Sequence, residues 1–161
     1  MKQKNKQLRK ILASIGIVIG ISCIVYFFVQ KEKGHEPRIK IGNQKVTLDV
    51  AVTEQEKMQG LSGRTALCDA CGMLFVFDSA MPQTFWMKDM LFDIDVLWID
   101  QNTIVGLQKD ISHKRQEKEV FVSSKPADKV VELPAGFIDT HHVWVGQIVD
   151  FSDIYSSNDG F

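Results

Sequence analysis

The sequence predicts a mainly β fold, a compact antiparallel β-sandwich or barrel with one or two short helices, preceded by a single N-terminal transmembrane helix. Between residues 38 and 151, short stretches in which apolar and polar residues alternate are separated by turn-forming residues, as is typical of strands. Residues 11–29 are 19 uncharged positions in a row, 15 of them apolar, which is enough for a helix to cross a bilayer. The whole chain is 45% apolar and 24% charged, a composition that excludes a disordered protein.

The N-terminal segment is predicted to act as a signal anchor in the cell membrane. Residues 1–10 carry five basic side chains and no acidic one. Because basic residues stay on the cytoplasmic side, we expect a cytoplasmic N-terminus and an extracytoplasmic domain. A cleaved signal peptide is the alternative, although no Ala-x-Ala site follows the apolar run. Gly16 and Gly20 form a Gly-x-x-x-Gly pattern, which would allow two such helices to form a weak dimer.

The extracytoplasmic domain is expected at residues 38–151, after a linker at residues 30–37. Its first elements are strands at Ile39–Ile41 and Val46–Val52, joined by a turn at Gly42-Asn43. Thr53-Glu54-Gln55-Glu56 is a capping box, so a short helix is predicted from there to Gly60.

The rest of the domain is predicted to be rich in strands. They are expected at Met73–Phe77, Thr84–Lys88, Asp93–Ile99, Thr103–Gln108, Glu119–Val122 and Val130–Leu133, with one or two more within Val143–Phe151. Pro134-Ala135-Gly136 suits a turn into a second short helix. Residues 152–161 are expected to be a loose polar tail.

The charge of the chain is divided between its two ends. Residues 30–161 carry 14 basic and 20 acidic side chains, a net charge of −6. A protein that binds phosphate backbones needs a basic face, so we expect no nucleic-acid partner. The sequence also contains no Gly-rich phosphate loop, serine nucleophile elbow or His-Glu-x-x-His pattern. It therefore predicts no cofactor and leaves open whether the protein is an enzyme.

Four clusters of residues, taken in order, resemble a known family. They are Gly60-Leu61-Ser62-Gly63-Arg64, Gly72-Met73-Leu74-Phe75-Val76-Phe77, Phe85-Trp86-Met87-Lys88-Asp89-Met90 with Asp95-Val96-Leu97-Trp98-Ile99-Asp100, and Glu132-Leu133-Pro134-Ala135-Gly136. Over about residues 45–151 they are similar to the bacterial and archaeal domain-of-unknown-function 192 family. The resemblance implies a compact, mainly β domain, frequently exported behind a signal or anchor, with no established activity. Ser62, Asp89-Met90 and Asp93 depart from the family pattern, in which Met, Asn-Thr and Pro are usual.

Arg64, Trp86, Lys88 and Asp95 are the candidate ligand-binding residues. On the predicted strand 84–88, Trp86 and Lys88 point to one face, and Asp93 and Asp95 share a face of the next strand. An aromatic ring, a cation and carboxylates that face one another across a turn are typical of a polar ligand pocket. They are equally typical of a solvated sheet face with surface ion pairs.

Cys68 and Cys71 are a candidate disulfide, because a Cys-x-x-Cys pair outside the cytoplasm tends to be oxidised. A redox pair is an alternative, although a loop precedes the pair and an apolar strand follows it. A zinc site would need two more ligands, and His35, His113, His141 and His142 stand at no recognised spacing. The thioethers of Met73, Met81, Met87 and Met90 would suit Cu(I), or fill the core as methionines usually do. We predict no metal site from these patterns.

These observations support two main hypotheses of function. The first is a membrane-anchored extracytoplasmic module that binds a small ligand or an envelope component. The alternative is a cell-envelope enzyme that uses Lys88, Asp93 and Asp95, since paired carboxylates beside a lysine can carry out acid and base chemistry. A copper- or zinc-handling protein is a weaker alternative. The two main hypotheses differ in whether these side chains meet in one pocket.

Overall fold

The computed structural model describes residues 36–114 and 120–155. The predicted cytoplasmic segment, the transmembrane helix at residues 11–29 and its Gly16 and Gly20 lie outside these ranges. Within them, no helix combines the length and the apolar character that crossing a membrane requires. The described residues form one compact unit.

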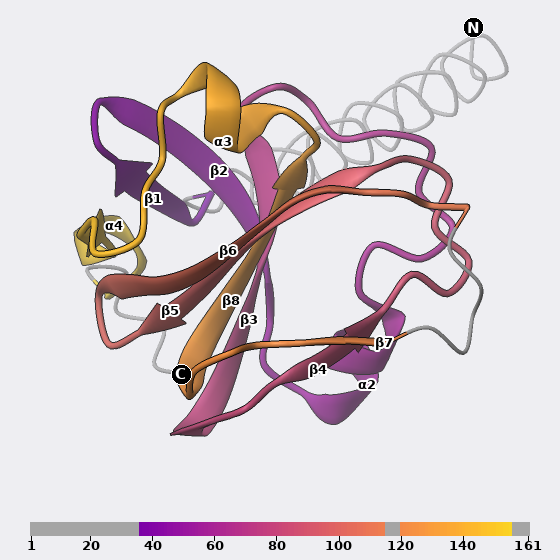
Figure 1. Cartoon of the computed structure of the whole chain (residues 1–161), viewed down its shortest axis with the longest axis horizontal. Helices are drawn as coiled ribbons and strands as arrows, with labels where there is room; N and C mark the ends of the chain where they lie inside the picture. The colour runs from indigo at the N-terminus through magenta and orange to yellow at the C-terminus, as the bar shows by residue number, and fades with distance from the viewer. Residues whose placement is uncertain (1–35, 115–119, 156–161) are drawn as a thin grey trace, which may run out of the picture. The chain divides into compact units, whose positions relative to one another are not determined.

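The unit is built on one seven-stranded sheet, and Figure 1 shows how its labelled strands are arranged. The strand order is β6 (Thr103–Ile111), β5 (Ile94–Asp100), β8 (Ala127–Pro134), β3 (Cys71–Met81), β2 (Gln44–Ala51), β1 (Arg38–Ile41) and β9 (Val149–Asp150). A second sheet pairs β4 (Thr84–Trp86) with β7 (Val120–Val122). The prediction of a mainly β fold is therefore confirmed.

The prediction that all strands are antiparallel is wrong at one place, where β2 and β3 run parallel. Thr47 lies opposite Cys71 and Ala51 opposite Phe75, so the register advances in the same direction along both strands. The physical reason is the connection, because α2 (Glu54–Gln59) and the loop after it carry the chain back to the start of β2. A tight hairpin turn can join only antiparallel strands, whereas a crossover of this length permits a parallel pair.

The sheet curls into a half-barrel, and residues 146–149 link its two ends. The backbone N–H of Gly146 donates to the carbonyl of Ile104 at the start of β6 (2.7 Å), and the N–H of Ile104 donates to the carbonyl of Gln147 (3.0 Å). Two residues later, Val149 of β9 lies opposite Ile41 of β1. Of the one or two strands predicted within Val143–Phe151, the structure forms β9. The residues just before β9 instead form the hydrogen bonds with Ile104 that join the two ends of the sheet.

The end of the described chain also differs from prediction. Residues 152–155, expected to begin a loose tail, form the short helix α4 (Ser152–Tyr155). Ile154 is only 3% exposed and packs with Phe151 in the core. Burial of these apolar side chains stabilises the helix against the sheet.

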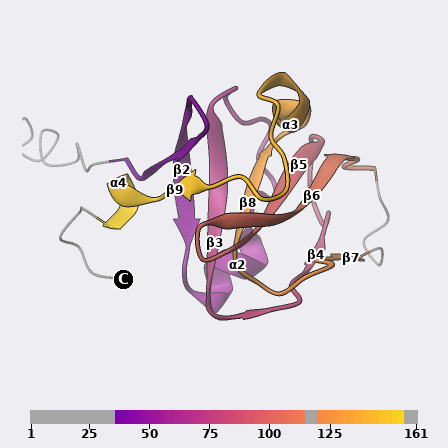
Figure 2. The same cartoon turned by 60° about the vertical axis from the view of Figure 1, so that its left-hand side comes forward.

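Two hydrophobic clusters cover the two faces of the sheet. The first cluster includes residues of α3 (Phe137–Thr140), and the second cluster lies on the side of α2, β4 and β7. Figures 1 and 2 show α3 and the β4–β7 sheet at opposite ends of the molecule. The first cluster contains Ile39, Ile41, Val46, Leu48, Leu74, Leu97, Ile99, Ile104, Val131, Leu133, Phe137, Ile138, Val143, Val149, Phe151 and Ile154. The second contains Ala51, Leu61, Met73, Phe75, Met87, Met90, Ile94, Val96, Trp98, Ile111, Phe121, Ala127 and Val130.

The predicted capping box is confirmed and fixes the start of α2. The Thr53 hydroxyl oxygen accepts a hydrogen bond from the Glu56 N–H (3.2 Å), and the Glu56 carboxylate accepts one from the Thr53 N–H (2.9 Å). Hydrogen bonds from Thr53 and Val52 hold the pKa of Glu56 below its usual value. The cap fixes the direction in which α2 begins. No residue of α2 is buried, and one side of the helix faces the sheet across a cavity.

Candidate ligand site

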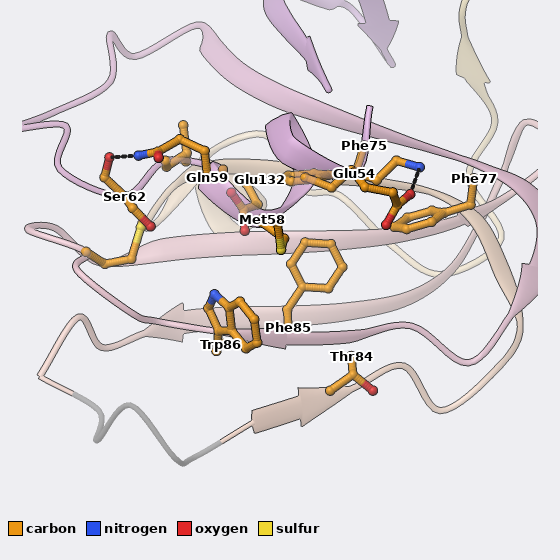
Figure 3. A pocket seen from close by; sticks show the side chains of 14 residues that line it. Glu54, Met58, Gln59, Ser62, Phe75, Phe77, Thr84, Phe85, Trp86 and Glu132 are labelled. Carbon is orange, nitrogen blue, oxygen red and sulfur yellow. Dashed lines mark hydrogen bonds and ion pairs between the residues drawn. The ribbon is translucent and has the colours of Figure 1, made fainter. Parts of the chain in front are cut away.

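A pocket of about 190 Å³ lies between α2, β4 and the face of the sheet that carries the second cluster. Figure 3 shows its side chains, with Phe85 and Trp86 of β4 facing Met58, Gln59 and Glu132. The lining comes from three parts of the chain. They are residues of α2 and the loop after it (Glu54, Lys57, Met58, Gln59, Gly60, Leu61, Ser62), of the sheet (Phe75, Phe77, Glu132), and of β4 and its following turn (Thr84, Phe85, Trp86, Met90).

Two consecutive residues of β4 contribute to the aromatic wall of the pocket. Phe85 points into the second cluster, where its ring meets Phe75 edge to face at 4.9 Å and Trp98 at 5.5 Å between centroids. Trp86, the next residue, lines the same pocket but stays 46% exposed. Consecutive residues of one short strand therefore form the inner wall and the rim of the pocket.

Glu132 is the one acidic residue buried on the sheet side of this pocket. It lies on β8 opposite Met73 of β3 and Val96 of β5, so its neighbours on the same face are apolar. The residue is only 4% exposed, and among the described residues its Oε2 has no hydrogen-bond partner. Burial raises the pKa of Glu132 to about 8, against the opposing effect of the Arg64 charge. Its carboxyl group is thus predominantly protonated at neutral pH.

Arg64, a predicted site residue, lies beside this pocket rather than in it. Its guanidinium forms an ion pair with Asp49 of β2, and both line a neighbouring hollow. That hollow shares Gln59 and Gly60 with the pocket of Glu132. Arg64 therefore acts on Glu132 through its charge, while its own hydrogen bond goes to Asp49.

Lys88 does not lie on a strand with Trp86 as predicted, because β4 ends at Trp86 and Lys88 begins a turn. The turn is held by the loop after α2. The Ser62 hydroxyl donates to the Lys88 carbonyl (2.8 Å), and the Gly63 N–H donates to the Asp89 carbonyl (2.8 Å). The Lys88 side chain is exposed and does not line the pocket. Its backbone, rather than its amine, helps to close one side of the site.

Asp95 lies on the opposite face of the sheet from Glu132 and is completely buried. One carboxylate oxygen accepts the N–H of Asp110 on β6 and the other accepts the N–H of Ile138 in α3, both at 2.8 Å. Because its two oxygens bind backbone N–H groups of two different elements, Asp95 joins β6 and α3 to β5. The structure does not bring Asp95 to Trp86, Lys88 or Arg64, because successive residues of β5 alternate between faces.

Asp93 also has a local role in the structure. Its Oδ1 accepts the His113 N–H (2.7 Å) and lies 2.6 Å from the His113 Nδ1. These hydrogen bonds from His113 lower the pKa of Asp93. Across the described ranges, no hydrogen bond or ion pair joins Lys88 to Asp93 or Asp95. The three residues of the enzyme hypothesis do not converge.

The remaining candidates occupy separate places. Cys68 and Cys71 form a disulfide in the structure, with their Cα atoms 5.0 Å apart. His141 stacks on Phe137, with 4.3 Å between the ring centroids, and His35 lies outside the described residues. In the part of the chain that the structure describes, no three His, Cys, Asp or Glu side chains are grouped as metal ligands.

The methionines proposed for copper divide into two groups. Met73, Met87 and Met90 are buried in the second cluster, whereas Met81 is exposed at the end of β3. Buried thioethers among apolar side chains act as core fillers.

The sequence did not single out Glu132 as a candidate site residue, although Glu132 opens one of the quoted motifs. The signal was present, since a single acidic residue interrupts the apolar run Val130–Leu133 of a central strand. Charged residues are almost never buried in such strands without a partner. What the sequence could not show is that the face of the strand on which Glu132 lies borders a pocket.

The fold and the site define a small β-rich domain that holds one buried carboxyl group in an apolar, aromatic pocket. Residues 37–151 match the family DUF192 (Uncharacterized ACR, COG1430), and the chain belongs to this family. The resemblance noted from its motifs is thereby confirmed. No curated protein shows a significant match to the chain.

Two solved structures share the fold. One, from Sinorhizobium meliloti 1021, is described as a putative transcription regulator; it is 26% identical, with a TM-score of 0.65 over 72% of this chain and 92% of that one. The other is a protein of unknown function from Novosphingobium aromaticivorans DSM 12444. It is 20% identical, with a TM-score of 0.65 over 70% of this chain and 83% of that one.

Proposed function

We propose that this protein is a membrane-anchored, extracytoplasmic module that binds a small ligand or a small part of an envelope component in the pocket of Glu132. The single observation that carries the proposal is the Oε2 atom of Glu132, which is buried at an apolar pocket without a partner among the described residues. A buried polar atom left unpaired costs about 1–3 kcal/mol. A ligand that supplies the missing hydrogen bond recovers that free energy.

The membrane part of the proposal rests on the sequence. The basic residues 1–10 and the apolar residues 11–29 support a cytoplasmic N-terminus and a domain on the outer side. The net charge of −6 over residues 30–161 supports a partner other than nucleic acid. We therefore do not extend the description of the Sinorhizobium protein to this chain.

The enzyme alternative finds no support in the geometry, because Lys88, Asp93 and Asp95 lie in three separate environments. Asp95 and Asp93 are each bound to backbone N–H groups. Lys88 is exposed in a turn. No observation favours a second function over binding.

The proposal is tested by screening the full chain in a non-ionic detergent for ligands that raise its melting temperature, with metals, sugars, peptides and cell-wall fragments. A ligand at about 100 times its Kd raises the free energy of unfolding by about 3 kcal/mol. We expect the Trp86→Ala variant to lose this stabilisation, with Trp144→Ala as the matched control, because Trp144 is also exposed but lines no part of this pocket. A hit that binds Trp86→Ala as well as it binds the native chain would place the ligand elsewhere.

A further inference from the structure

We propose that the pocket receives a cationic head group, an ammonium or guanidinium on a short apolar stem, which pairs with Glu132 and lies against the aromatic wall. This inference rests on the proposed function and names the chemical class of its ligand. The shared chemistry is a monovalent organic cation, whether it belongs to a free amine or to the side chain of a peptide.

The first support is the kind of surface that surrounds Glu132. Four aromatic side chains, Phe75, Phe77, Phe85 and Trp86, line the pocket. The faces of aromatic rings attract cations. Aromatic rings together with one carboxyl group are suited to a cation with an apolar stem, because the rings contact the stem and the carboxylate contacts the charge.

The second support is that the pocket already holds an ammonium group of the chain itself at its rim. The Nζ of Lys57 lies 4.9 Å from the centroid of the Phe77 ring and 3.1 Å from the Oε1 of Glu54. This pair of contacts, one aromatic and one carboxylate, is the arrangement that we infer for the ligand at Glu132. Lys57 is paired with Glu54, and among the described residues the Oε2 of Glu132 has no hydrogen-bond partner.

The third support is the balance of charge around Glu132. The basic group that acts on it is Arg64, whose guanidinium is paired with Asp49. On the pocket itself, the positive charge of Lys57 is matched by Glu54. A cationic ligand would therefore meet one carboxyl group that no cation of the described residues already pairs, whereas an anionic ligand would meet no free cation among the residues that line the pocket.

The size of the pocket sets the part of the ligand that can enter. Its volume of about 190 Å³ is below the roughly 300–1,000 Å³ of sites that enclose a whole drug-sized molecule. A head group with a few methylene groups fits this description better than a sugar or a nucleoside. The acidic surplus of residues 30–161 would also attract a cation toward the domain.

Binding of such a cation has a consequence for the proton on Glu132. Because the buried carboxyl is protonated at neutral pH, pairing converts Glu132–COOH and R–NH3+ to Glu132–COO−, R–NH3+ and a proton released to solvent. The titratable groups that face the site are few. They are Glu54, Glu56 and Lys57 from α2, Arg64 from the following loop and Asp49 from β2, while β3 and β4 contribute Phe75, Phe77, Thr84, Phe85 and Trp86, which carry no charge.

The experiment compares two cations with a neutral molecule of the same shape. Titration calorimetry on the full chain in a non-ionic detergent would use n-butylammonium, n-propylguanidinium and n-propylurea at pH 7, in two buffers of different ionisation enthalpy. We expect the cations to bind at least about tenfold more tightly than the urea. The Glu132→Gln variant should lose this preference, while Glu36→Gln, an exposed control outside the pocket, should retain it. The buffer dependence should report proton release in the native chain and none in Glu132→Gln.

Each other outcome has a definite meaning. If n-propylurea binds as tightly as the cations, or if Glu132→Gln binds cations as well as the native chain does, the inference is overturned while a pocket ligand found by the screen still supports the proposed function. If no cation binds, the inference fails on its own. A further arm with Nα-acetyl-lysinamide distinguishes the sources: tighter binding than n-butylammonium assigns the head group to a peptide side chain, and weaker binding assigns it to a free amine.

Discussion

At the scale of single residues, two buried carboxyl groups on neighbouring strands behave in opposite ways. Asp95 accepts two backbone hydrogen bonds, whereas the Oε2 of Glu132 has no partner in the described part of the chain. The apolar surrounding of Glu132 stabilises its neutral acid form. The first arrangement holds elements together, and the second leaves a group that a ligand can satisfy.

The raised pKa of Glu132 predicts how stability depends on pH. In the unfolded chain the group titrates near 4.5, and in the folded domain near 8. Between these values the folded state holds a proton that the unfolded state releases, so the free energy of unfolding falls as pH rises. We expect Glu132→Gln to gain stability relative to the native chain between pH 5 and pH 9, on the order of a few kcal/mol.

Urea unfolding at the two pH values measures this gain. Glu36→Gln serves as control, because its exposed side chain should leave the difference from the native chain the same at both pH values. If the free energies of unfolding of Glu132→Gln and of the native chain differ by the same amount at both pH values, the assignment of the raised pKa to Glu132 is contradicted.

At the scale of elements, the site depends on how neighbouring segments are held against the sheet. The loop after α2 binds the turn after β4 through Ser62 and Gly63. On the other face, Asp95 binds α3 and β6 to β5. Two motifs far apart in the sequence, Gly60–Arg64 and Phe85–Met90, therefore meet in the fold.

The Asp95→Asn variant tests the role of this carboxylate. An amide offers one acceptor oxygen where two backbone N–H groups require one each, so one donor is left unpaired. We expect a loss of about 2–4 kcal/mol in the free energy of unfolding. Asp69→Asn, in the exposed loop between the cysteines, is the control. Unchanged stability of Asp95→Asn would show that the two hydrogen bonds contribute nothing net.

Gly72 at the start of β3 is predicted to tolerate no side chain. A Cβ there would lie 2.6 Å from the backbone oxygen of Glu132, closer than such atoms approach in proteins. Because that oxygen belongs to the neighbouring strand β8, the strands would have to move apart. We expect Gly72→Ala to lose about 3 kcal/mol or to misfold, whereas Ser79→Ala, at the exposed end of the same strand, should unfold like the native chain in urea.

At the scale of the whole molecule, the proposal divides the chain into an anchor and an outer binding domain. The described domain has its own core on both faces of one sheet. The pocket is built within that domain. Binding and anchoring can therefore be tested separately.

The anchor predicts a simple fractionation result. Because residues 11–29 are apolar and uncharged, the full chain should stay with membranes after a carbonate wash, while a chain that begins at residue 31 should be recovered in the supernatant. Recovery of the full chain in the wash would refute the anchor.

The location also predicts the state of the cysteines. In protein that reaches the oxidising side of the membrane, Cys68 and Cys71 should resist alkylation unless a reductant is added. A Cys68→Ser variant provides the control, since its Cys71 should then be labelled. Free thiols at both positions in the exported native chain would contradict the disulfide.

The sequence by itself determined the mainly β class, the capping box of α2 and the family. These features are local, because strand alternation, a capping pattern and short motifs are each written within a few neighbouring residues. The sequence also singled out Trp86, which lies on β4 within the predicted strand 84–88. The end of β4 before Lys88 depended on the loop after α2, which no local pattern of the strand records.

Only the tertiary structure decided which of these residues share a site. The parallel pairing of β2 and β3 and the strand order place Glu132 between Met73 and Val96, on the face that α2 and β4 cover. The same arrangement puts Asp95 on the other face, under α3. Elements distant in the sequence decide which face of a central strand borders a pocket. For this reason the sequence shows a glutamate at position 132 but does not identify it as the carboxyl group of a candidate binding site.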